Sequence, residues 1–312
     1  MQKILRIGTR DSQLAVWQAT LVKDALKKVG IEAELVYIKS EGDIDLITPL
    51  YEIGVEGIFT KSLDAALLNG RVDLAVHSLK DVPVRLAKGL QQAAVLERGS
   101  YSDIFVPHPA AKAPEYSMNS LTDKNAVIAT SSIRRIAQWL HRFPGHKIEN
   151  LRGSVNTRLS KLEQSNWEGA IFAAAGLERI GLRPQQSVDL DWMLPAPAQG
   201  AIVVVCREHD DGISTALKGL NHEPTAFCTK IEREFLKALL GGCSTPISAL
   251  AQLVNGKVSF KGNILSPDGK MIAEVTLEEP VENALQLGAS AARTILQNGG
   301  EVIIESIRNA TR

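Results

Sequence analysis

The sequence predicts an α/β protein with three domains, of which the last is a small α+β domain. Apolar strands alternate with helical periodicity along most of the chain up to residue 205. Hairpin turn signals stand in the last part of the chain, at Asn255-Gly256 and Asp268-Gly269. The chain has 312 residues, and a domain usually holds roughly 150. These observations predict two α/β domains followed by an antiparallel sheet.

The first domain is predicted as strand, helix and strand in turn. Residues 3–7 form the first expected strand, and apolar residues from Leu14 to Leu26 recur at helical spacing until Gly30 ends that helix. The next expected elements are a strand over 33–38, a helix over 59–68 and a strand over 72–76. Because such alternation is typical of βαβ units, we expect parallel strands.

A second α/β run is expected after Gly99. Its elements are a strand over 127–129, helices over 132–141 and 155–162, and a buried strand over 170–174. Residues 201–205 are apolar enough for another buried strand, which we expect to return to the first domain. The first domain then comprises 1–98 and 200–219, and the second comprises 99–199.

The third domain, 220–312, has a different character. A helix is expected over 225–240, followed by the turn Gly241-Gly242-Cys243. The hairpin signals join three strand segments, at 248–253, 257–264 and 271–277. We expect an antiparallel three-stranded sheet with a helix over 284–296 covering one face.

Composition and charge exclude several classes of protein. Hydrophobic residues make up 45% and charged residues 22%, as in ordinary globular domains. Lys and Arg number 35, as do Asp and Glu, so no net charge draws the whole chain to nucleic acid or anionic lipid. No signal-peptide core or membrane-spanning run is evident. We therefore expect a cytoplasmic protein without a membrane or nucleic-acid partner.

Disulfide and metal chemistry are not indicated either. The three cysteines, Cys206, Cys228 and Cys243, include no CxxC pair, and the six histidines show no ligand spacing. Apolar neighbours favour Cys206 and Cys228 as small buried side chains. Cys243 follows two glycines, which let the backbone approach a ligand, so its thiol is a candidate nucleophile.

Basic residues recur where predicted strands end and helices begin. They are Arg10, Lys80, Arg134, Arg135, Arg152 and Arg158. Each alone is compatible with a solvated surface, but a convergent group suits a small substrate with several carboxylates. The stretches 7–12 and 128–132 resemble each other, since each ends a strand and opens a helix whose N–H groups favour an anion. Two such sites would suit opposite walls of a cleft.

The segment 77–83, His-Ser-Leu-Lys-Asp-Val-Pro, follows the strand predicted over 72–76. Catalytic side chains often lie at the carboxyl ends of strands in open α/β sheets. Pro83 restricts the turn that presents Lys80 and Asp81. Asp81 is therefore a candidate catalytic carboxylate, with pairing to Lys80 or capping of the turn as the structural alternative.

Taken in order, these motifs resemble the hydroxymethylbilane synthase family, also called the porphobilinogen deaminases, over essentially the whole chain. The matching segments are Ile7-Gly8-Thr9-Arg10 with Ser12, Val76 to Pro83, Thr130 to Arg135, Leu151-Arg152-Gly153, Thr157-Arg158-Leu159, Gln199-Gly200-Ala201 and Gly241-Gly242-Cys243. The resemblance implies two α/β domains like those of periplasmic binding proteins, flanking a cleft. It also implies that the third domain carries the cysteine on a loop.

A chemistry follows from the same resemblance. A dipyrromethane cofactor is held through a thioether to Cys243, four porphobilinogen units are added with loss of ammonia, and the linear tetrapyrrole is released by hydrolysis. Asp81 is implied as the catalytic residue, which stabilises the cation formed as ammonia leaves. Implied cofactor-binding residues are Cys243, Ser12, Lys80, Asp81, Thr130, Ser131, Ser132, Arg134 and Arg135, and implied substrate-binding residues are Arg10, Arg152, Arg158 and Gln199. The resemblance implies a monomer.

Three positions depart from the family pattern. Glu56 stands where a lysine is common, which puts one expected carboxylate contact in doubt. The segment 194–200 lacks the usual Val-Gly before Gln199, so we expect a hinge of different stiffness. Glu178 replaces a common basic residue beside Arg179, which weakens the case for Arg179 as a ligand.

Two other functions stay open from the residues alone. A solute-binding protein would share two α/β lobes with anion-binding helix starts, although the lack of an export signal and the Gly-Gly-Cys loop count against it. A cysteine-nucleophile acyl transferase would use Cys243 with His77 or His222. Neither histidine lies in a recognisable protease-like pattern.

Overall fold

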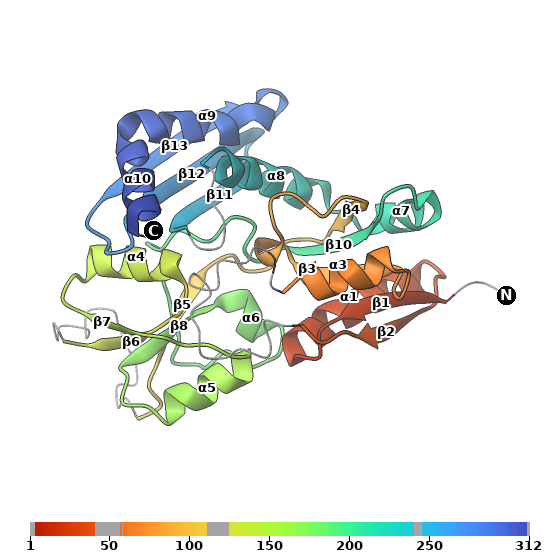
Figure 1. The fold of residues 1–312 in the computed structure, drawn as a ribbon, viewed down its shortest axis with the longest axis horizontal. Helices are drawn as coiled ribbons and strands as arrows, with labels where there is room; N and C mark the ends of the chain where they lie inside the picture. Colours follow the sequence, from red (N-terminus) through yellow and green to blue (C-terminus); the bar gives the residue numbers. More distant parts are fainter. Residues whose placement is uncertain (1–3, 41–56, 58, 111–124, 240–244, 311–312) are drawn as a thin grey trace. The chain divides into compact units, whose positions relative to one another are not determined.

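The computed structural model describes residues 4–40, 57, 59–110, 125–239 and 245–310. These residues belong to two compact units, whose elements can be followed by label and colour in Figure 1. The first unit contains the described parts of 1–46, 55–99 and 200–227, and the second contains those of 100–199 and 228–312. The second unit thus includes an α/β part and the C-terminal part. The boundaries expected for three domains stay a prediction.

The first unit is built on a five-stranded sheet with the order β2-β1-β3-β10-β4. Its strands are β1 (Leu5–Thr9), β2 (Ala33–Tyr37), β3 (Leu74–Ser78), β4 (Leu90–Val95) and β10 (Ile202–Arg207). β1 runs parallel to β2 and β3, as the alternation with helices predicts. β10 pairs antiparallel with β3 and β4, a direction that the alternation of strands and helices over 3–76 does not predict. β10 enters after the chain returns from the second unit, so no βαβ crossover fixes its direction.

Helices α1 (Gln13–Lys28), α3 (Lys61–Leu68) and α7 (Asp211–Leu217) belong to this unit. α8 (Glu223–Ala238) begins in it and continues into the second unit. α1 starts where predicted because Ser12 caps it, its side chain accepting a hydrogen bond from the N–H of Ala15. Two basic residues, Lys27 and Lys28, occupy its last turn, where their positive charges interact favourably with the negative end of the helix dipole.

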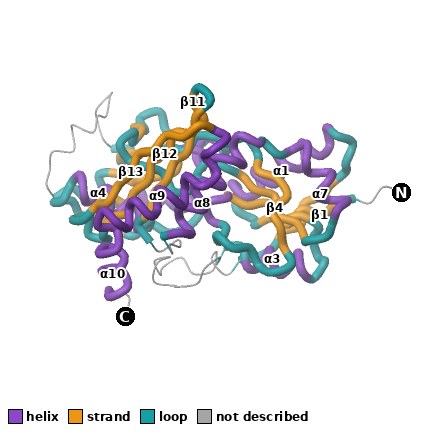
Figure 2. The backbone as a smooth tube through the Cα atoms, turned by 90° about the horizontal axis from the view of Figure 1, so that it is seen from above, coloured by secondary structure: helices purple, strands orange, loops and turns teal. Residues whose placement is uncertain are grey.

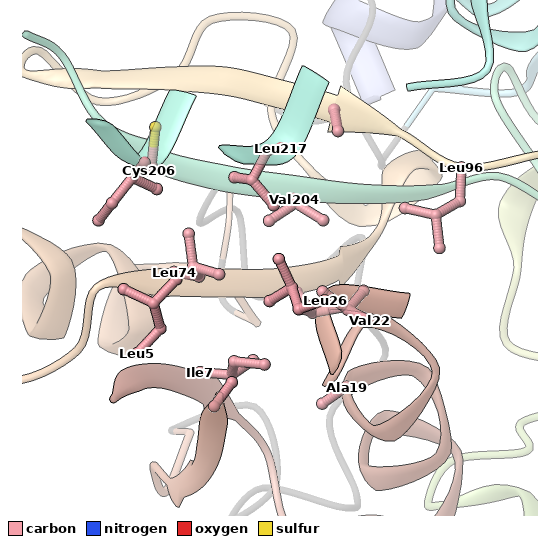
Figure 3. Close-up of a cluster of buried hydrophobic side chains, with 14 of the residues drawn as sticks. Leu5, Ile7, Ala19, Val22, Leu26, Leu74, Leu96, Val204, Cys206 and Leu217 are labelled. Carbon is pink, nitrogen blue, oxygen red and sulfur yellow. The ribbon is translucent and has the colours of Figure 1, made fainter. Parts of the chain in front are cut away.

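The core of the first unit lies between its sheet and the helices packed against it. Figure 3 shows Ile7 and Leu74 of the sheet close to Val22 and Leu26 of α1. All four side chains are fully buried. Cys206 of β10 lies in the same cluster with no exposed surface, which confirms the prediction that it is a small buried side chain. Burial also raises the pKa of its thiol, which makes this cysteine a poor nucleophile.

The α/β part of the second unit has a five-stranded sheet with the order β7-β6-β8-β5-β9. Its strands are β5 (Asp103–Pro107), β6 (Val127–Ala129), β7 (Lys147–Glu149), β8 (Gly169–Ala173) and β9 (Val188–Asp189). β6 is parallel to β7 and β8, whereas β5 is antiparallel to β8 and β9. Helices α4 (Ile133–Arg142), α5 (Val155–Glu163) and α6 (Ala174–Glu178) accompany the sheet.

Successive residues of β5 pack on opposite faces of this sheet, as the twofold period of a strand requires. Ile104 lies in a cluster with Leu162 of α5 and Leu177 of α6. Phe105, the next residue, stacks with Trp139 of α4, with ring centroids 5.6 Å apart. Both faces of the sheet are therefore covered, which explains why the whole of β5 is buried.

The C-terminal part contains the antiparallel three-stranded sheet that the hairpin signals predict. Its strands are β11 (Ile247–Val254), β12 (Lys257–Leu265) and β13 (Ile272–Pro280), paired in that order. Val254 pairs with Lys257 across a two-residue turn, in which Asn255 and Gly256 have φ values of 50° and 77°. Positive φ at both central residues is what such a hairpin turn demands, so the Asn-Gly signal is confirmed.

The helix predicted over 284–296 is only partly correct. The structure has a 3₁₀ segment, Val281–Gln286, and then α9 (Leu287–Ile295), which lies along β12 and β13 in Figure 2. The backbone leaves the helical region at Asn298 and Gly299, where φ is 95° at Gly299. A further helix, α10 (Glu301–Ala310), follows this bend and was not predicted.

Hydrogen bonds join the C-terminal part to the α/β part within the second unit. Gln138 of α4 donates from its side-chain amide to the hydroxyl of Ser248, at 3.0 Å. His141 of the same helix lies 2.8 Å from the carbonyl oxygen of Gly269 through its Nδ1. The C-terminal sheet is therefore bonded to the helix that the Thr130–Ser132 segment opens.

The described residues contain no helix with both the length and the apolar character needed to cross a membrane. The same residues contain no group of three or more His, Cys, Asp or Glu side chains that would hold a metal ion.

Close packing at Gly288 predicts a large effect of one methyl group. A Cβ at this position of α9 would overlap the carbonyl oxygen of Ile231 and lie 3.0 Å from the nitrogen of Phe235, both in α8. We expect Gly288→Ala to lower the free energy of unfolding by about 1–3 kcal/mol, measured by denaturant unfolding. Gly212 in α7 has no atom near its Cβ position, so Gly212→Ala is the control and should be neutral or slightly stabilising. Equal effects of the two substitutions would contradict the packing argument.

Candidate functional site

The first unit places four of the predicted site residues at one edge of its sheet. β1 and β3 are parallel neighbours, so their carboxyl ends lie at the same edge. Arg10 and Ser12 follow β1, and Lys80 and Asp81 follow β3 in the 3₁₀ segment Leu79–Asp81. The structure therefore brings these four residues to a common edge, as predicted for a site in an open α/β sheet.

The turn that carries Lys80 and Asp81 is fixed by the residue before them. Leu79 is buried, and its N–H donates to the carbonyl oxygen of Ala201 at 3.0 Å. The N–H of Val82, also buried, donates back to the carbonyl oxygen of Leu79 at 3.2 Å. With both neighbours held inside, Lys80 and Asp81 are left partly exposed at the sheet edge.

Arg10 and Ser12 are held by contacts of different kinds. The guanidinium of Arg10 lies over the ring of Phe59, 4.5 Å from its centroid, which fits a cation–π contact. Ser12 accepts from the N–H of Ala15 at 3.4 Å, and this bond leaves its hydroxyl hydrogen to donate elsewhere. Both residues thus have a polar group suited to a carboxylate.

His77 of β3 lies next to this edge and is neutral at physiological pH. Burial, together with the positive charge of Arg10, lowers its pKa to about 4. Its Nε2 atom has no hydrogen-bond partner among the described residues. His77, one of the two histidines considered for acyl transfer, is therefore a buried neutral ring. The other, His222, is hydrogen-bonded through Nδ1 to the hydroxyl of Thr225 at 2.8 Å.

The second unit gathers another group at the carboxyl edge of its sheet. The segment Thr130–Ser132 links β6 to α4, and Arg152 lies between β7 and α5. Because β6 and β7 are parallel neighbours, the two loops lie together. The hydroxyl of Ser131 donates to the carbonyl oxygen of Leu151 at 2.9 Å, which joins them directly.

The start of α4 is open to an anion in a way that the start of α5 is not. Ser154 caps α5 by accepting from the N–H of Thr157 at 3.2 Å. Ser132 occupies the same N-cap position of α4, but its side chain makes no capping bond. The first N–H groups of α4 therefore lack this partner, and the helix dipole adds a positive potential there.

A buried carboxylate that the sequence analysis missed organises two predicted site residues. Asp103, at the start of β5, is completely buried. Its Oδ2 accepts from Nη2 of Arg134 at 2.6 Å, and its Oδ1 accepts from Nη2 of Arg135 at 2.7 Å and from Nε at 3.1 Å. Asp103 lies 31 positions before Arg134, so no local spacing signals the pair. The available hint was the pair of adjacent arginines at a predicted helix start, since such cations need an anion when they are buried.

Gln199, predicted to bind substrate, is bonded to the same carboxylate. Its Nε2 donates to Oδ1 of Asp103 at 2.9 Å and to the carbonyl oxygen of Tyr101 at 2.8 Å. The residues around it have unusual backbone angles, with φ of 63° at Ala198 and 86° at Gly200. In this chain Gln199 fixes a tightly bent segment.

Glu232 of α8 holds the same segment from the other side. Its carboxylate is fully buried and accepts from the N–H of Ala198 at 2.6 Å and from the N–H of Ala251 at 2.8 Å. The carbonyl oxygen of Pro195 accepts from the N–H of Ala249 at 3.1 Å. The segment 194–200, where the sequence departs from the family pattern, is therefore bonded to β11 within the second unit.

The remaining residues named from the sequence lie in different surroundings. Arg152 is buried, and Arg158 donates through Nε to the carbonyl oxygen of Gly153 at 2.8 Å. Glu178 pairs with Arg183 at 2.6 Å, which gives the anion at this departure from the family pattern a local partner. Cys243 and Glu56 lie outside the described residues.

Two family descriptions match this chain along most of its length. "Porphobilinogen deaminase, dipyromethane cofactor binding domain" matches residues 5–215, and "Porphobilinogen deaminase, C-terminal domain" matches residues 226–297. The chain belongs to the porphobilinogen deaminase family. Its activity is that of a hydroxymethylbilane synthase, a transferase of tetrapyrrole biosynthesis that uses porphobilinogen and a dipyrromethane cofactor. The family resemblance of the sequence is thereby confirmed.

Solved structures similar to this chain include solute-binding proteins. One is an ancestral cationic amino acid solute binding protein, with 15% identity, a TM-score of 0.45, and 70% of this chain and 87% of that chain covered. Another is an arginine-specific periplasmic binding protein of Salmonella typhimurium, with 12% identity, a TM-score of 0.41, and 72% of this chain and 94% of that chain covered. A third is the substrate binding protein of an amino acid ABC transporter, with 12% identity, a TM-score of 0.38, and 70% of this chain and 91% of that chain covered. The observed sheets, rather than these likenesses, establish the α/β class.

The described residues fit a cofactor that carries carboxylates. Arg134 and Arg135 together with Asp103 bring two positive charges and one negative charge into a buried site. The uncapped start of α4 adds backbone N–H donors beside them. Positive charge and N–H donors in one place are the groups that bind acetate and propionate side chains.

Acid should remove stability that the neutral form of His77 supports. Its pKa is about 4 when folded against 6.5 ordinarily, so the unfolded chain takes up the proton first and stability falls as pH drops between these values. Between pH 7 and pH 4 we expect the wild type to lose up to about 3 kcal/mol more free energy of unfolding than His77→Gln. Denaturant unfolding at the two pH values measures both, and equal losses would show that folding does not lower the pKa of His77.

Proposed function

We propose that Cys243 holds the dipyrromethane cofactor through a thioether and that Asp81 is the catalytic carboxylate of this porphobilinogen deaminase. The other two cysteines support the first assignment. Cys206 is fully buried and Cys228 is 6% exposed, so neither presents a thiol to a cofactor. Cys243 follows two glycines, a sequence that lets a backbone approach a bound group.

The observation that supports the role of Asp81 is its place on a fixed turn at the carboxyl edge of the first sheet. The buried neighbours Leu79 and Val82 hold that turn, so the carboxylate is presented without a flexible backbone. Loss of ammonia from porphobilinogen breaks a C–N bond and leaves positive charge on the pyrrole. A carboxylate in position before that charge develops stabilises it without reorganisation.

The cations and hydroxyls of the two edges are proposed to bind carboxylates. When bound, the cofactor supplies the pyrrole carbon to which the first substrate is joined. The proposed cofactor-binding residues are Ser12, Lys80, Asp81, Thr130, Ser131, Ser132, Arg134 and Arg135, and the proposed substrate-binding residues are Arg10, Arg152, Arg158 and Gln199. Arginine suits this role because its planar fork matches a carboxylate with two N–H groups.

We also propose that the enzyme works as a cytoplasmic monomer without a nucleic-acid or membrane partner. The balanced charge of the chain, with 35 basic and 35 acidic residues, supports the lack of a polyanionic partner.

Intact mass tests the attachment site. Wild-type protein from cells that make porphobilinogen should exceed its calculated mass by two linked pyrrole units after denaturation, and Cys243→Ala should not. The thioether survives denaturation, whereas a ligand held by hydrogen bonds does not. Cys228→Ala is the matched control and should keep the added mass. A modified Cys243→Ala protein would show that another residue carries the cofactor.

Steady-state kinetics test Asp81. In cofactor-loaded enzyme, Asp81→Asn should lower kcat about 10²–10³-fold, because the amide cannot offset a developing positive charge. Asp11 is an exposed carboxylate at the same sheet edge, and Asp11→Asn should leave kcat within about twofold. Cofactor content is read from the intact mass, so that only loaded enzymes are compared. A loaded Asp81→Asn enzyme with wild-type kcat would contradict the assignment.

A further inference from the structure

We propose that Asp103 is a positioning residue for the known reaction: it aligns Arg134 and Arg135 and leaves the buried pair one positive charge, which takes a carboxylate of the bound pyrrole chain. This inference rests on the cofactor-binding role proposed above for the two arginines. Asp103 itself need not touch the ligand. It acts through the guanidinium groups that it holds.

The geometry fixes both guanidiniums relative to each other. Each oxygen of Asp103 serves a different arginine, with Oδ2 bonded to Arg134 and Oδ1 to Arg135. Backbone carbonyl oxygens hold the far sides, since Leu194 accepts from Nη1 of Arg134 at 2.7 Å and Ile171 accepts from Nη1 of Arg135 at 3.0 Å. Neither arginine can rotate without breaking an ion pair and a hydrogen bond.

The backbone of Asp103 is fixed as well. It begins β5 and pairs with Ala173 at the end of β8. Its carbonyl oxygen accepts from the N–H of Leu190 at 2.9 Å. The carboxylate therefore stands at a set place at the carboxyl edge of the sheet, where the start of α4 also lies.

Donor hydrogens are left over after these bonds are made. A guanidinium has five N–H donors. Arg134 uses two of its donors, and Arg135 uses three. Three N–H donors of Arg134 and two of Arg135 therefore have no acceptor among the described residues. The side chains are only 5% and 7% exposed, so water does not surround these donors. A ligand carboxylate would accept from two of these donors at once, as a charge-assisted pair.

A second buried aspartate shows how this chain neutralises arginines that have a purely structural role. Asp73 also pairs with two arginines, Arg6 at 3.0 Å and Arg207 at 3.5 Å. There the arginine side chains are 34% and 25% exposed, and Arg207 has a second carboxylate, Asp210, at 3.2 Å. At Asp73, two positive charges are thus balanced by two negative charges, and the arginine side chains are in contact with water. At Asp103 the ion pairs set two cations against one anion inside the protein, which favours an incoming carboxylate.

Asp103→Asn tests the proposal, with Asp73→Asn as the matched control. Apo-protein is incubated with porphobilinogen, and the growth of the covalent adduct is followed by intact mass, with KM and kcat measured on the loaded enzyme. Asp103→Asn should form the adduct at least tenfold more slowly and raise KM at least tenfold, with kcat changed less than threefold. Asp73→Asn should lower the thermal midpoint but leave adduct formation and KM unchanged.

A second variant keeps the test valid if Asp103→Asn does not fold. Asp103→Asn combined with Arg135→Gln restores the native charge of the buried group while the alignment of Arg134 is lost, and it should form the adduct more slowly than Arg135→Gln alone. Wild-type rates in the folded single variant, or equal rates in the double variant and Arg135→Gln, with only a lower thermal midpoint, would overturn the proposal. No adduct in the wild type would instead overturn the proposed function, so the two failures are distinguishable.

Discussion

The charge balance around Asp103 is the constraint on which the second unit depends. Burying a guanidinium is costly unless an anion and acceptors surround it, and here two guanidiniums share one carboxylate at 2.6 and 2.7 Å. The same carboxylate accepts from Gln199, the last residue before the chain returns to the first unit. A single side chain thus links the helix start at Thr130–Ser132 to the tightly bent segment around Ala198 and Gly200.

The first unit solves a different problem with backbone rather than charge. Its candidate groups, Lys80 and Asp81, are partly exposed, so they need little desolvation but do need a defined position. Leu79 and Val82 provide it, because a buried apolar residue on each side of the two polar ones fixes the turn that presents them. The bond from the N–H of Leu79 to Ala201 ties the turn to the segment that enters β10. The antiparallel strand that the sequence predicted only in part is therefore the support for the proposed catalytic carboxylate.

The sequence allowed the local features to be predicted and missed the distant ones. β6 was predicted at its observed bounds, and α4 and α5 within about a residue or two, because apolar periodicity and serine caps act over a few positions. The direction of β10 depends on where the chain returns, and Asp103 meets its partner 31 positions away. α10 was missed because Asn298-Gly299-Gly300 is a strong stop signal, and a helix that restarts after it has no local mark.

The candidate site shows the same division between local and distant information. Arginines at strand ends could be identified from the sequence because their residue type is enough to suggest an anion site. Whether such an arginine can bind a ligand depends on the groups around it. Gln199 was predicted to bind substrate, and the structure shows its amide nitrogen bonded to Tyr101 and Asp103. Arg6 and Arg207 meet their carboxylates beside water, whereas Arg134 and Arg135 meet theirs inside the protein. Counting buried cations against buried anions therefore separates arginines that are balanced beside water from the two arginines proposed to bind a ligand, a distinction that sequence spacing alone does not contain.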